Sequence, residues 1–129
     1  MTSSERVGAY VLHNYARLMS PHERAVMQHL TILYKGRRTP PPAGTASHWS
    51  EEEGHYTRLL SSEPEVLADA DAGWDVARER IANRILSTYP SEVYLNRCPN
   101  CRALTATPTA RLCPACGHTW FHVPRDVRL

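Results

Sequence analysis

Four cysteines near the end of the chain constrain the fold more than any other feature of the sequence. They form two Cys-Pro-x-Cys pairs separated by eleven residues, Cys98–Cys101 and Cys113–Cys116, and the 129-residue chain has no other cysteine. Two thiolates three positions apart can span one edge of a tetrahedron, so two such pairs suit a Zn²⁺ ion held by four sulfurs at about 2.3 Å. The spacing therefore predicts a metal site in the last third of the chain.

The expected cellular compartment supports metal binding over disulfide formation. The sequence has no apolar run long enough to span a membrane, and its first residues lack the apolar core of a signal peptide. We therefore expect a cytoplasmic protein, in which thiols stay reduced and a CxxC pair binds metal more often than it forms a disulfide. A redox-active CxxC would need a βαβ setting that the sequence does not contain, so Zn²⁺ is favoured, with iron in the same S₄ cage as the main competitor.

Charge is unevenly distributed along the chain. Residues 1–95 have a formal balance of −2, whereas residues 96–129 have a balance of +4. Four thiolates around one Zn²⁺ ion carry a net charge of −2, which lowers the C-terminal balance to +2. This part of the chain is therefore expected to be mildly basic and not a strong polyanion-binding surface.

Apolar residues at helical spacing predict a mostly α-helical N-terminal part. A first helix is expected over residues 5–19, capped by Ser3 or Ser4. Ser20 and Glu23 form a capping box that starts a second helix. So short a turn between two amphipathic helices predicts an antiparallel helical hairpin.

A proline-rich loop and a short helix are expected next. Three consecutive prolines favour an exposed, extended loop over residues 37–49. Arg37 and Arg38, at its start, are expected to face the negative end of the second helix, with phosphate binding as the alternative. Glu52 and His55, in a short helix over about residues 51–60, match the Glu-x-x-His spacing of di-metal bundles. No second such motif exists, so a solvated helix face is favoured.

A long helix is expected over residues 63–88, opened by a capping box between Ser62 and Glu65. Gly73 is placed to kink it. Its acidic first half and arginine-rich second half complement the helix dipole, so they need no bound cation to explain them. An apolar stripe runs along one face as far as Thr88 and exceeds what two short helices can cover, which favours self-association through this helix.

The region around the cysteines resembles a known metal-binding fold. The residues between the two pairs have room for two short strands, those after Gly117 alternate like a third, and Gly117 can take the positive φ of a metal knuckle. Over about residues 93–123 this arrangement resembles the zinc ribbon. The resemblance implies that one structural Zn²⁺ is bound by Cys98, Cys101, Cys113 and Cys116. The stretch from Ser91 to Trp120 also resembles the C-terminus of short bacterial proteins without an assigned function, which implies no chemistry.

Two features depart from the zinc-ribbon pattern or add to it. Arg102 follows the first cysteine pair, where zinc ribbons usually have glycine. Because positive φ is disfavoured for arginine, the first knuckle is expected to be looser or differently turned. His118 and His122 are spare candidate ligands, and we expect them to be strand residues or hydrogen-bond donors near the site.

Together these patterns predict an α+β chain with two parts. A mostly α-helical domain over residues 1–90 contains the helical hairpin, the short helix and the long helix. A small zinc-ribbon module of short antiparallel strands follows over residues 91–129.

The function expected from this organisation is binding and not catalysis. Four thiolates leave no open coordination position for water or substrate, and no acid–base or nucleophile constellation is found elsewhere, so we expect the protein not to be an enzyme. The favoured hypothesis is a zinc-binding accessory or adaptor protein with a protein partner, and the second is a regulatory protein that binds nucleic acid. The expected contact residues are Arg97, Arg102, Arg111 and an exposed Trp120.

Two further hypotheses remain open. In the first, the metal only fastens the C-terminal tail to the helical core, and the helices carry the function. In the second, the chain is a redox- or zinc-responsive switch or an enzyme subunit, with a cleft lined by His22, His29 or Glu52.

Overall fold

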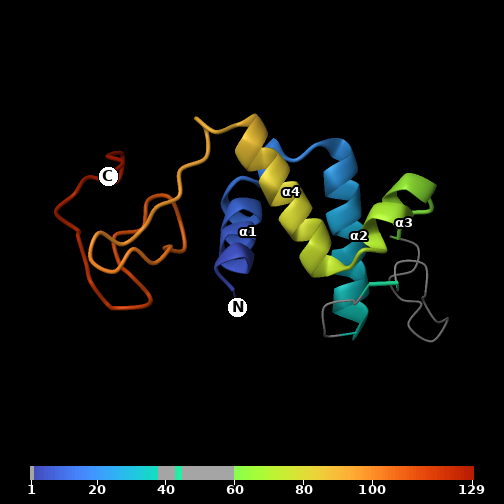
Figure 1. Ribbon diagram of the computed structural model, residues 1–129, viewed down its shortest axis with the longest axis horizontal. Helices are drawn as coiled ribbons and strands as arrows, with labels where there is room; N and C mark the ends of the chain where they lie inside the picture. The colour runs from blue at the N-terminus through green and yellow to red at the C-terminus, as the bar shows by residue number, and fades with distance from the viewer. Residues whose placement is uncertain (1, 38–42, 45–59) are drawn as a thin grey trace. The chain divides into compact units, whose positions relative to one another are not determined.

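The computed structural model describes residues 2–37, 43–44 and 60–129 of the chain (Figure 1). Within these ranges it forms four α-helices and one 3₁₀-helix. They are α1 (Ser3–Asn14), η1 (Ala16–Leu18), α2 (Pro21–Arg37), α3 (Pro64–Ala70) and α4 (Trp74–Thr88). Several predictions fall wholly or largely outside the described residues: most of the proline-rich loop with Arg38, and the short helix with Glu52 and His55.

The chain divides into two compact units. The first unit comprises residues 1–17 and 82–129, and the second comprises residues 18–81. Helix α4 contributes its last residues to the first unit and its earlier residues to the second. The first two helices belong to different units, so the predicted hairpin between them stays a prediction. The independent folding of residues 91–129 also stays a prediction.

The C-terminal segment, residues 91–129, is where the predicted fold class is wrong. Among the described residues there is no β-strand, only two isolated antiparallel bridges, Arg97 with Leu104 and Leu112 with Thr119. The expected α+β architecture with zinc-ribbon strands is therefore replaced by helices and irregular chain. One physical reason is that Asn96 Nδ2 donates to the carbonyls of Thr107 at 2.9 Å and Ala110 at 2.8 Å. Such side-chain bonds satisfy loop carbonyls that a strand ladder would otherwise pair.

The start of each of the first two helices is fixed by a capping box. For α1 the cap is Thr2, one residue before the predicted serines: its Oγ1 accepts from the Glu5 amide at 3.1 Å, and Glu5 Oε2 accepts from the Thr2 amide at 2.7 Å. The capping box at Ser20 and Glu23 is confirmed, with reciprocal bonds of 3.1 and 2.8 Å. The first helix is shorter than expected, because it ends at Asn14 and a 3₁₀ turn follows.

The predicted long helix is two helices. Helix α3 ends at Ala70 and α4 begins at Trp74, with Gly73 between them at a φ of 92°, which a right-handed helix cannot contain. The expected capping box is also wrong, since α3 has no side-chain cap and the Glu63 amide donates to Ser61 Oγ at 3.2 Å. The helical end at Thr88 is confirmed.

Each unit has its own buried apolar residues. In the second unit they are contributed by α2, α3 and the first half of α4: Val26, Leu30, Leu33, Val66, Ala70, Ala77 and Ile81. In the first unit Tyr10, Val11, Tyr15, Ala82 and Ile85 are buried. Burial of one large aliphatic side chain contributes about 1.5–3 kcal/mol to stability. The stripe on α4 is thus largely buried within one chain, so it no longer supports self-association, which stays a prediction.

None of the helices in the described part of the chain is both long enough and apolar enough to cross a bilayer.

Candidate metal centre

The cysteines lie in two knuckles that follow the same backbone path, fifteen residues apart. In the first knuckle, residues 96–105, the Cys98 amide donates to the Ala103 carbonyl at 2.8 Å, and the Thr105 amide donates to the Asn96 carbonyl at 2.9 Å. In the second knuckle, residues 111–120, the corresponding bonds run from Cys113 to His118 and from Trp120 to Arg111, both at 2.9 Å. The two Cys-Pro-x-Cys pairs therefore repeat in backbone structure as well as in sequence.

Arg102 and Gly117 occupy equivalent positions in the two knuckles and adopt the same conformation. Their φ angles are 67° and 77°, and Arg102 is the one non-glycine residue at positive φ in the described chain. The amide of Arg102 donates to the Cys98 carbonyl, and that of Gly117 to the Cys113 carbonyl, each at 2.9 Å. The expectation of a looser or different first knuckle is therefore wrong. Arginine takes the same turn, at a backbone strain of about 1–2 kcal/mol.

The two knuckles bring the four cysteine sulfurs together. All four Sγ atoms lie within 4.8 Å of one another. Two of the distances between the knuckles are 3.7 Å for Cys98 Sγ to Cys116 Sγ and 3.5 Å for Cys101 Sγ to Cys113 Sγ. The edge of a tetrahedron with zinc–sulfur bonds of 2.3 Å is about 3.8 Å. The four predicted ligands thus form a cage that could hold one metal ion, and sulfur chemistry alone suits zinc or iron.

Backbone amides point at the sulfurs of both knuckles. The amides of Asn100 and Cys101 donate to Cys98 Sγ at 3.3 and 3.5 Å, and the Cys116 amide donates to Cys113 Sγ at 3.4 Å. Hydrogen bonds to sulfur favour the thiolate, which is the metal-binding form. The tight turn after each proline therefore supplies donors as well as ligand spacing.

Hydrogen bonds at the cage lower the pKa of some of its thiols and raise that of another. The backbone amide of His118, and next the Asn100 side chain, lower the pKa of Cys116 to about 6. The amide of Cys116 lowers the pKa of Cys113. At Cys101 the amide of Ala103 acts in the same direction, but hydrogen bonds to the other thiols and local desolvation outweigh it and raise the pKa to about 12. Four sulfurs this close do not all ionise without a balancing charge, which a bound cation could supply.

One side of the cage is packed and the other is open to solvent. Cys98 and Cys113 are buried and form an apolar cluster with Trp120, against which Ala103 and Val123 pack. Cys101 and Cys116 are exposed. The packed side explains how the knuckles are held together without a strand ladder.

The predicted exposure of Trp120 is wrong. Its side chain is 1% exposed, and the His118 ring stacks on it with centroids 5.7 Å apart. The metal-ligand cluster found among the described residues contains the four cysteines but neither His118 nor His122. Trp120 therefore supports the cage from within and is not a surface contact.

Arg111 is also buried, which was not expected. Its guanidinium donates to the carbonyls of Val123 at 3.2 Å, Pro124 at 2.6 Å and Val127 at 2.6 Å, so it holds the end of the chain against the second knuckle. Arg97 and Arg102 are exposed, as a surface contact requires. Contact of these two residues with a partner stays a prediction.

Tyrosine hydroxyls on the helical side of the first unit bond to the C-terminal segment. The Tyr10 hydroxyl donates to the Tyr94 carbonyl at 2.6 Å and accepts from the Asn96 amide at 3.3 Å. The Tyr94 amide donates to the Tyr15 hydroxyl at 3.0 Å. Burial raises the pKa of Tyr10 to about 12, so its hydroxyl stays protonated at neutral pH. Helical spacing in the sequence does not reveal these polar roles of the tyrosines.

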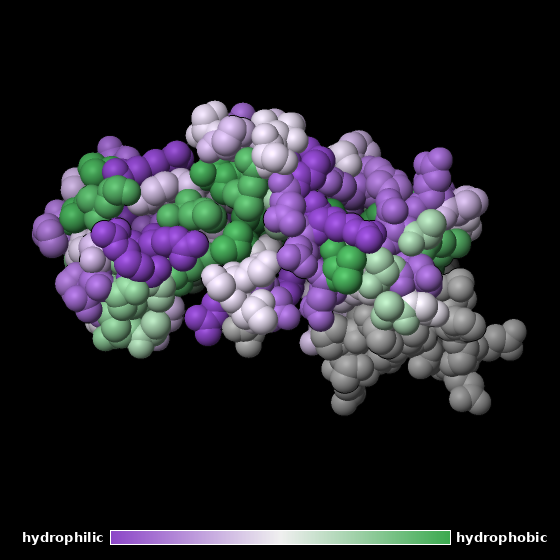
Figure 2. Space-filling view, viewed as in Figure 1, coloured by the Kyte–Doolittle hydropathy of each residue, from purple (hydrophilic) through white to green (hydrophobic). Residues whose placement is uncertain are grey.

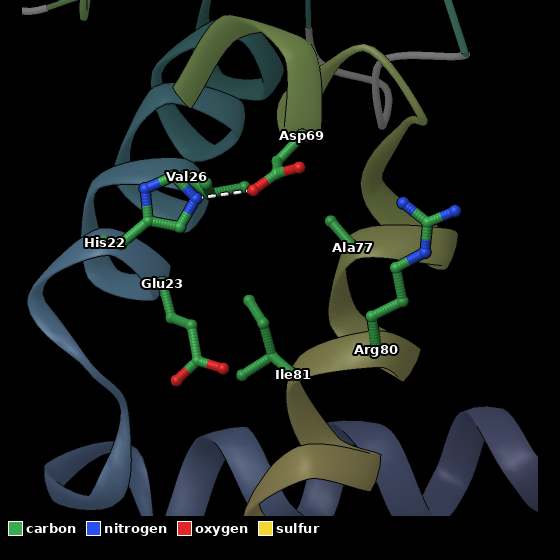
Figure 3. Close-up of a pocket in the computed structure, with 7 residues that line it drawn as sticks. All are labelled: His22, Glu23, Val26, Asp69, Ala77, Arg80 and Ile81. Carbon is green, nitrogen blue, oxygen red and sulfur yellow. Dashed lines mark hydrogen bonds and ion pairs between the residues drawn. The ribbon is translucent and has the colours of Figure 1, made fainter. Parts of the chain in front are cut away.

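The second unit contains the histidines suggested as cleft residues. His22 Nε2 lies 2.5 Å from Asp69 Oδ2, and the pair borders a cavity of about 170 Å³ (Figure 3). His29 is buried, and its Nδ1 accepts a hydrogen bond from the Ser61 amide at 3.1 Å. His29 therefore has a structural role, while Glu52 lies outside the described residues.

Comparisons with known proteins gave no match. No family model matches the sequence, and neither the curated proteins nor the solved structures provide a match.

Proposed function

We propose that the protein is a metal-stabilised accessory protein that holds one structural Zn²⁺ ion and binds another protein. The observation that carries the proposal is the four-cysteine cage, whose sulfur separations match a tetrahedral S₄ site. Four sulfur ligands fill such a site and leave no position for substrate, which favours a structural role for the ion. This argues for binding over catalysis.

Exposed apolar side chains of the C-terminal segment support a protein partner. Of the six large apolar side chains exposed in the described chain, four lie in this segment: Leu112, Phe121, Val127 and Leu129. Phe121 is 70% exposed. Figure 2 shows hydrophobic side chains among hydrophilic ones on this part of the surface. Exposed apolar side chains that gather in one segment favour a protein partner, whereas nucleic-acid sites are dominated by positive charge.

The metal half of the proposal is tested by metal analysis of the purified protein. We expect one zinc per chain, released by a strong chelator and absent from Cys113→Ser. Iron in place of zinc would correct the metal, and a metal-free protein with full structure would overturn the structural role.

The partner half is tested by site-specific photo-crosslinking in cells. A photoreactive amino acid at position 121 should give a discrete protein adduct, and the same group at position 76 should not. Val76 is the matched control, because it is 40% exposed but lies in the other unit. A nuclease-sensitive adduct from position 121 would support nucleic-acid binding instead, and the absence of any discrete adduct would contradict partner binding through the surface around Phe121.

A further inference from the structure

A second candidate site lies in the first unit, beside the first knuckle. A cavity of about 300 Å³ is lined by residues of the first turns of α1 and of the first knuckle, including Ser3, Arg6, Arg97 and Arg102. Three arginines therefore line one hollow with no carboxylate among its lining residues. The described ion pairs involve none of the three.

Contacts and backbone geometry within the first knuckle restrain two of the three arginines, Arg97 and Arg102. Arg102 is set by its positive φ, and Arg97 Nη1 donates to the Arg102 carbonyl at 3.4 Å. Arg6 lies on the first turns of α1, whose nearby carboxylate, Glu5, accepts from the Thr2 amide. Arginines that line one cavity without a carboxylate among them suit phosphate, which guanidinium groups bind through paired N–H donors.

The metal cage reduces this positive charge but does not cancel it. Among the four ligands only Cys101 lines the cavity. If the net charge of −2 on a loaded S₄ site is shared equally, each sulfur carries about half a unit. A dianion therefore still meets a positive surface. A phosphomonoester carries about −1.5 to −2 at neutral pH, which suits three arginines better than the single charge of a carboxylate.

A second hollow adjoins the first and supplies apolar surface. Its volume is about 330 Å³, and it shares Arg6 and Leu104 with the arginine cavity. Ala9, Tyr10 and Pro114 are among its other lining residues. Arg6, Tyr10 and His13 recur at helical spacing, so the hollow follows one face of α1. A ligand with a phosphate at one end and an apolar body at the other would fill both spaces.

We propose that the cavity formed by Arg6, Arg97 and Arg102 binds a phosphomonoester, with its apolar body in the adjoining hollow beside Leu104. The site differs from the exposed apolar side chains invoked for a protein partner, so either proposal can fail alone. The competing explanation is that the arginines only offset the charge of the thiolates.

The test is calorimetric titration of the zinc-loaded full chain at low ionic strength. The probes are inorganic phosphate and phenyl phosphate, the latter having the shared phosphomonoester chemistry and a small apolar body. We expect saturable binding of both and at least tenfold tighter binding of phenyl phosphate. Absence of saturable phosphate binding, or equal affinity for the two probes, would overturn the proposal.

Two matched arginine variants distinguish a specific phosphate site from general electrostatic attraction of anions. Arg6→Gln should weaken phenyl phosphate binding at least tenfold with unchanged zinc content and circular dichroism. Arg125→Gln removes an exposed arginine outside the cavity and should change binding less than twofold. Equal loss in both variants, or loss of zinc affinity without loss of phosphate binding in Arg6→Gln, would favour the charge-offset explanation and overturn the site. A nucleoside 5′-monophosphate and a phosphotyrosine peptide, titrated in parallel, then distinguish a small molecule from a modified side chain.

Discussion

The hydroxyl of Tyr10 on helix α1 donates a hydrogen bond to the backbone carbonyl of Tyr94, 84 positions later, at 2.6 Å. The same oxygen accepts from the amide of Asn96, two residues before the first ligand cysteine. Asn14 Nδ2, one turn further along α1, donates to the Ala106 carbonyl at 3.0 Å. The metal-binding segment is therefore bonded to a helix and shares a compact unit with it.

Tyr10→Phe should destabilise the first unit by about 1–3 kcal/mol, because it leaves a buried amide and a carbonyl without their shared partner. Chemical denaturation of the zinc-loaded protein measures this loss. Tyr34→Phe is the control, since Tyr34 is 38% exposed in the second unit and the change should be within about 0.5 kcal/mol. Equal, small effects in both variants would mean that the Tyr10 bonds add nothing to stability.

Cys113→Ser should abolish tight metal binding and loosen the whole first unit, including α1. The physical reason is that folding of a small metal site draws its free energy from the ion, and α1 is bonded to that site. Metal analysis and far-ultraviolet circular dichroism check the two parts of this prediction.

The matched control for the metal site is Ser87→Ala, on the exposed surface of α4 in the same unit. It should retain one metal ion and most of its helical signal. If Cys113→Ser also retained its helical signal and thermal stability, the metal segment would be an appended module, and the α1 contacts would not depend on it.

The metal site could be predicted from sequence because its determinants are local. Two Cys-Pro-x-Cys pairs fix ligand type and spacing, and the structure gathers these four sulfurs. The capping box at Ser20 and Glu23 was equally local and is confirmed. The break at Gly73 was less predictable, because a glycine in a helical pattern can be tolerated, kink the helix or end it.

The roles of Trp120 and Arg111 depended on tertiary structure that spacing does not encode. Trp120 was expected as an exposed contact residue, but the cysteine cluster needs an apolar side chain to pack against, and Trp120 supplies it. Arg111 was assigned to the surface as a charged residue. Instead, three carbonyls of the chain end converge on its guanidinium, which presents the fixed fork of donors that such an arrangement requires.

The His22–Asp69 pair should make the stability of the second unit depend on pH. The hydrogen bond from Asp69 raises the pKa of His22 above its usual 6.5. Because the folded pKa is the higher one, the contribution is fully present below pH 6.5 and is lost as pH rises through the raised value. Both side chains are more than one-third exposed, so the effect should be at most about 0.5 kcal/mol.

The measurement for this pair is denaturation of wild type and Asp69→Asn at pH 6 and pH 9. The variant should be less stable than wild type at pH 6 and equal to it at pH 9. A constant difference at both values would mean that the histidine charge is not involved. Asp75→Asn is a matched control, because Asp75 lies on a neighbouring helix and pairs with Arg78, which does not titrate in this range.

The equivalent turns at Arg102 and Gly117 lead us to expect opposite changes in stability for Arg102→Gly and Gly117→Ala. Arg102→Gly removes the strain of positive φ, which is about 1–2 kcal/mol, but adds flexibility to the unfolded chain. The net effect should be a stabilisation of about 0.5–1 kcal/mol. Gly117→Ala should destabilise by about 1 kcal/mol through backbone strain alone, because a Cβ atom there meets no heavy atom within 4 Å.

Denaturation of the zinc-loaded variants, in a phosphate-free buffer, measures both effects. Gly44→Ala is a control for positive φ away from the metal site, since Gly44 has a φ of 83° and also open space around it. If Gly117→Ala lowered metal affinity while Gly44→Ala lowered only stability, the turn would act on the cage itself. If Arg102→Gly were destabilising, the arginine side chain would contribute more to the folded knuckle than its backbone strain removes, contrary to our expectation.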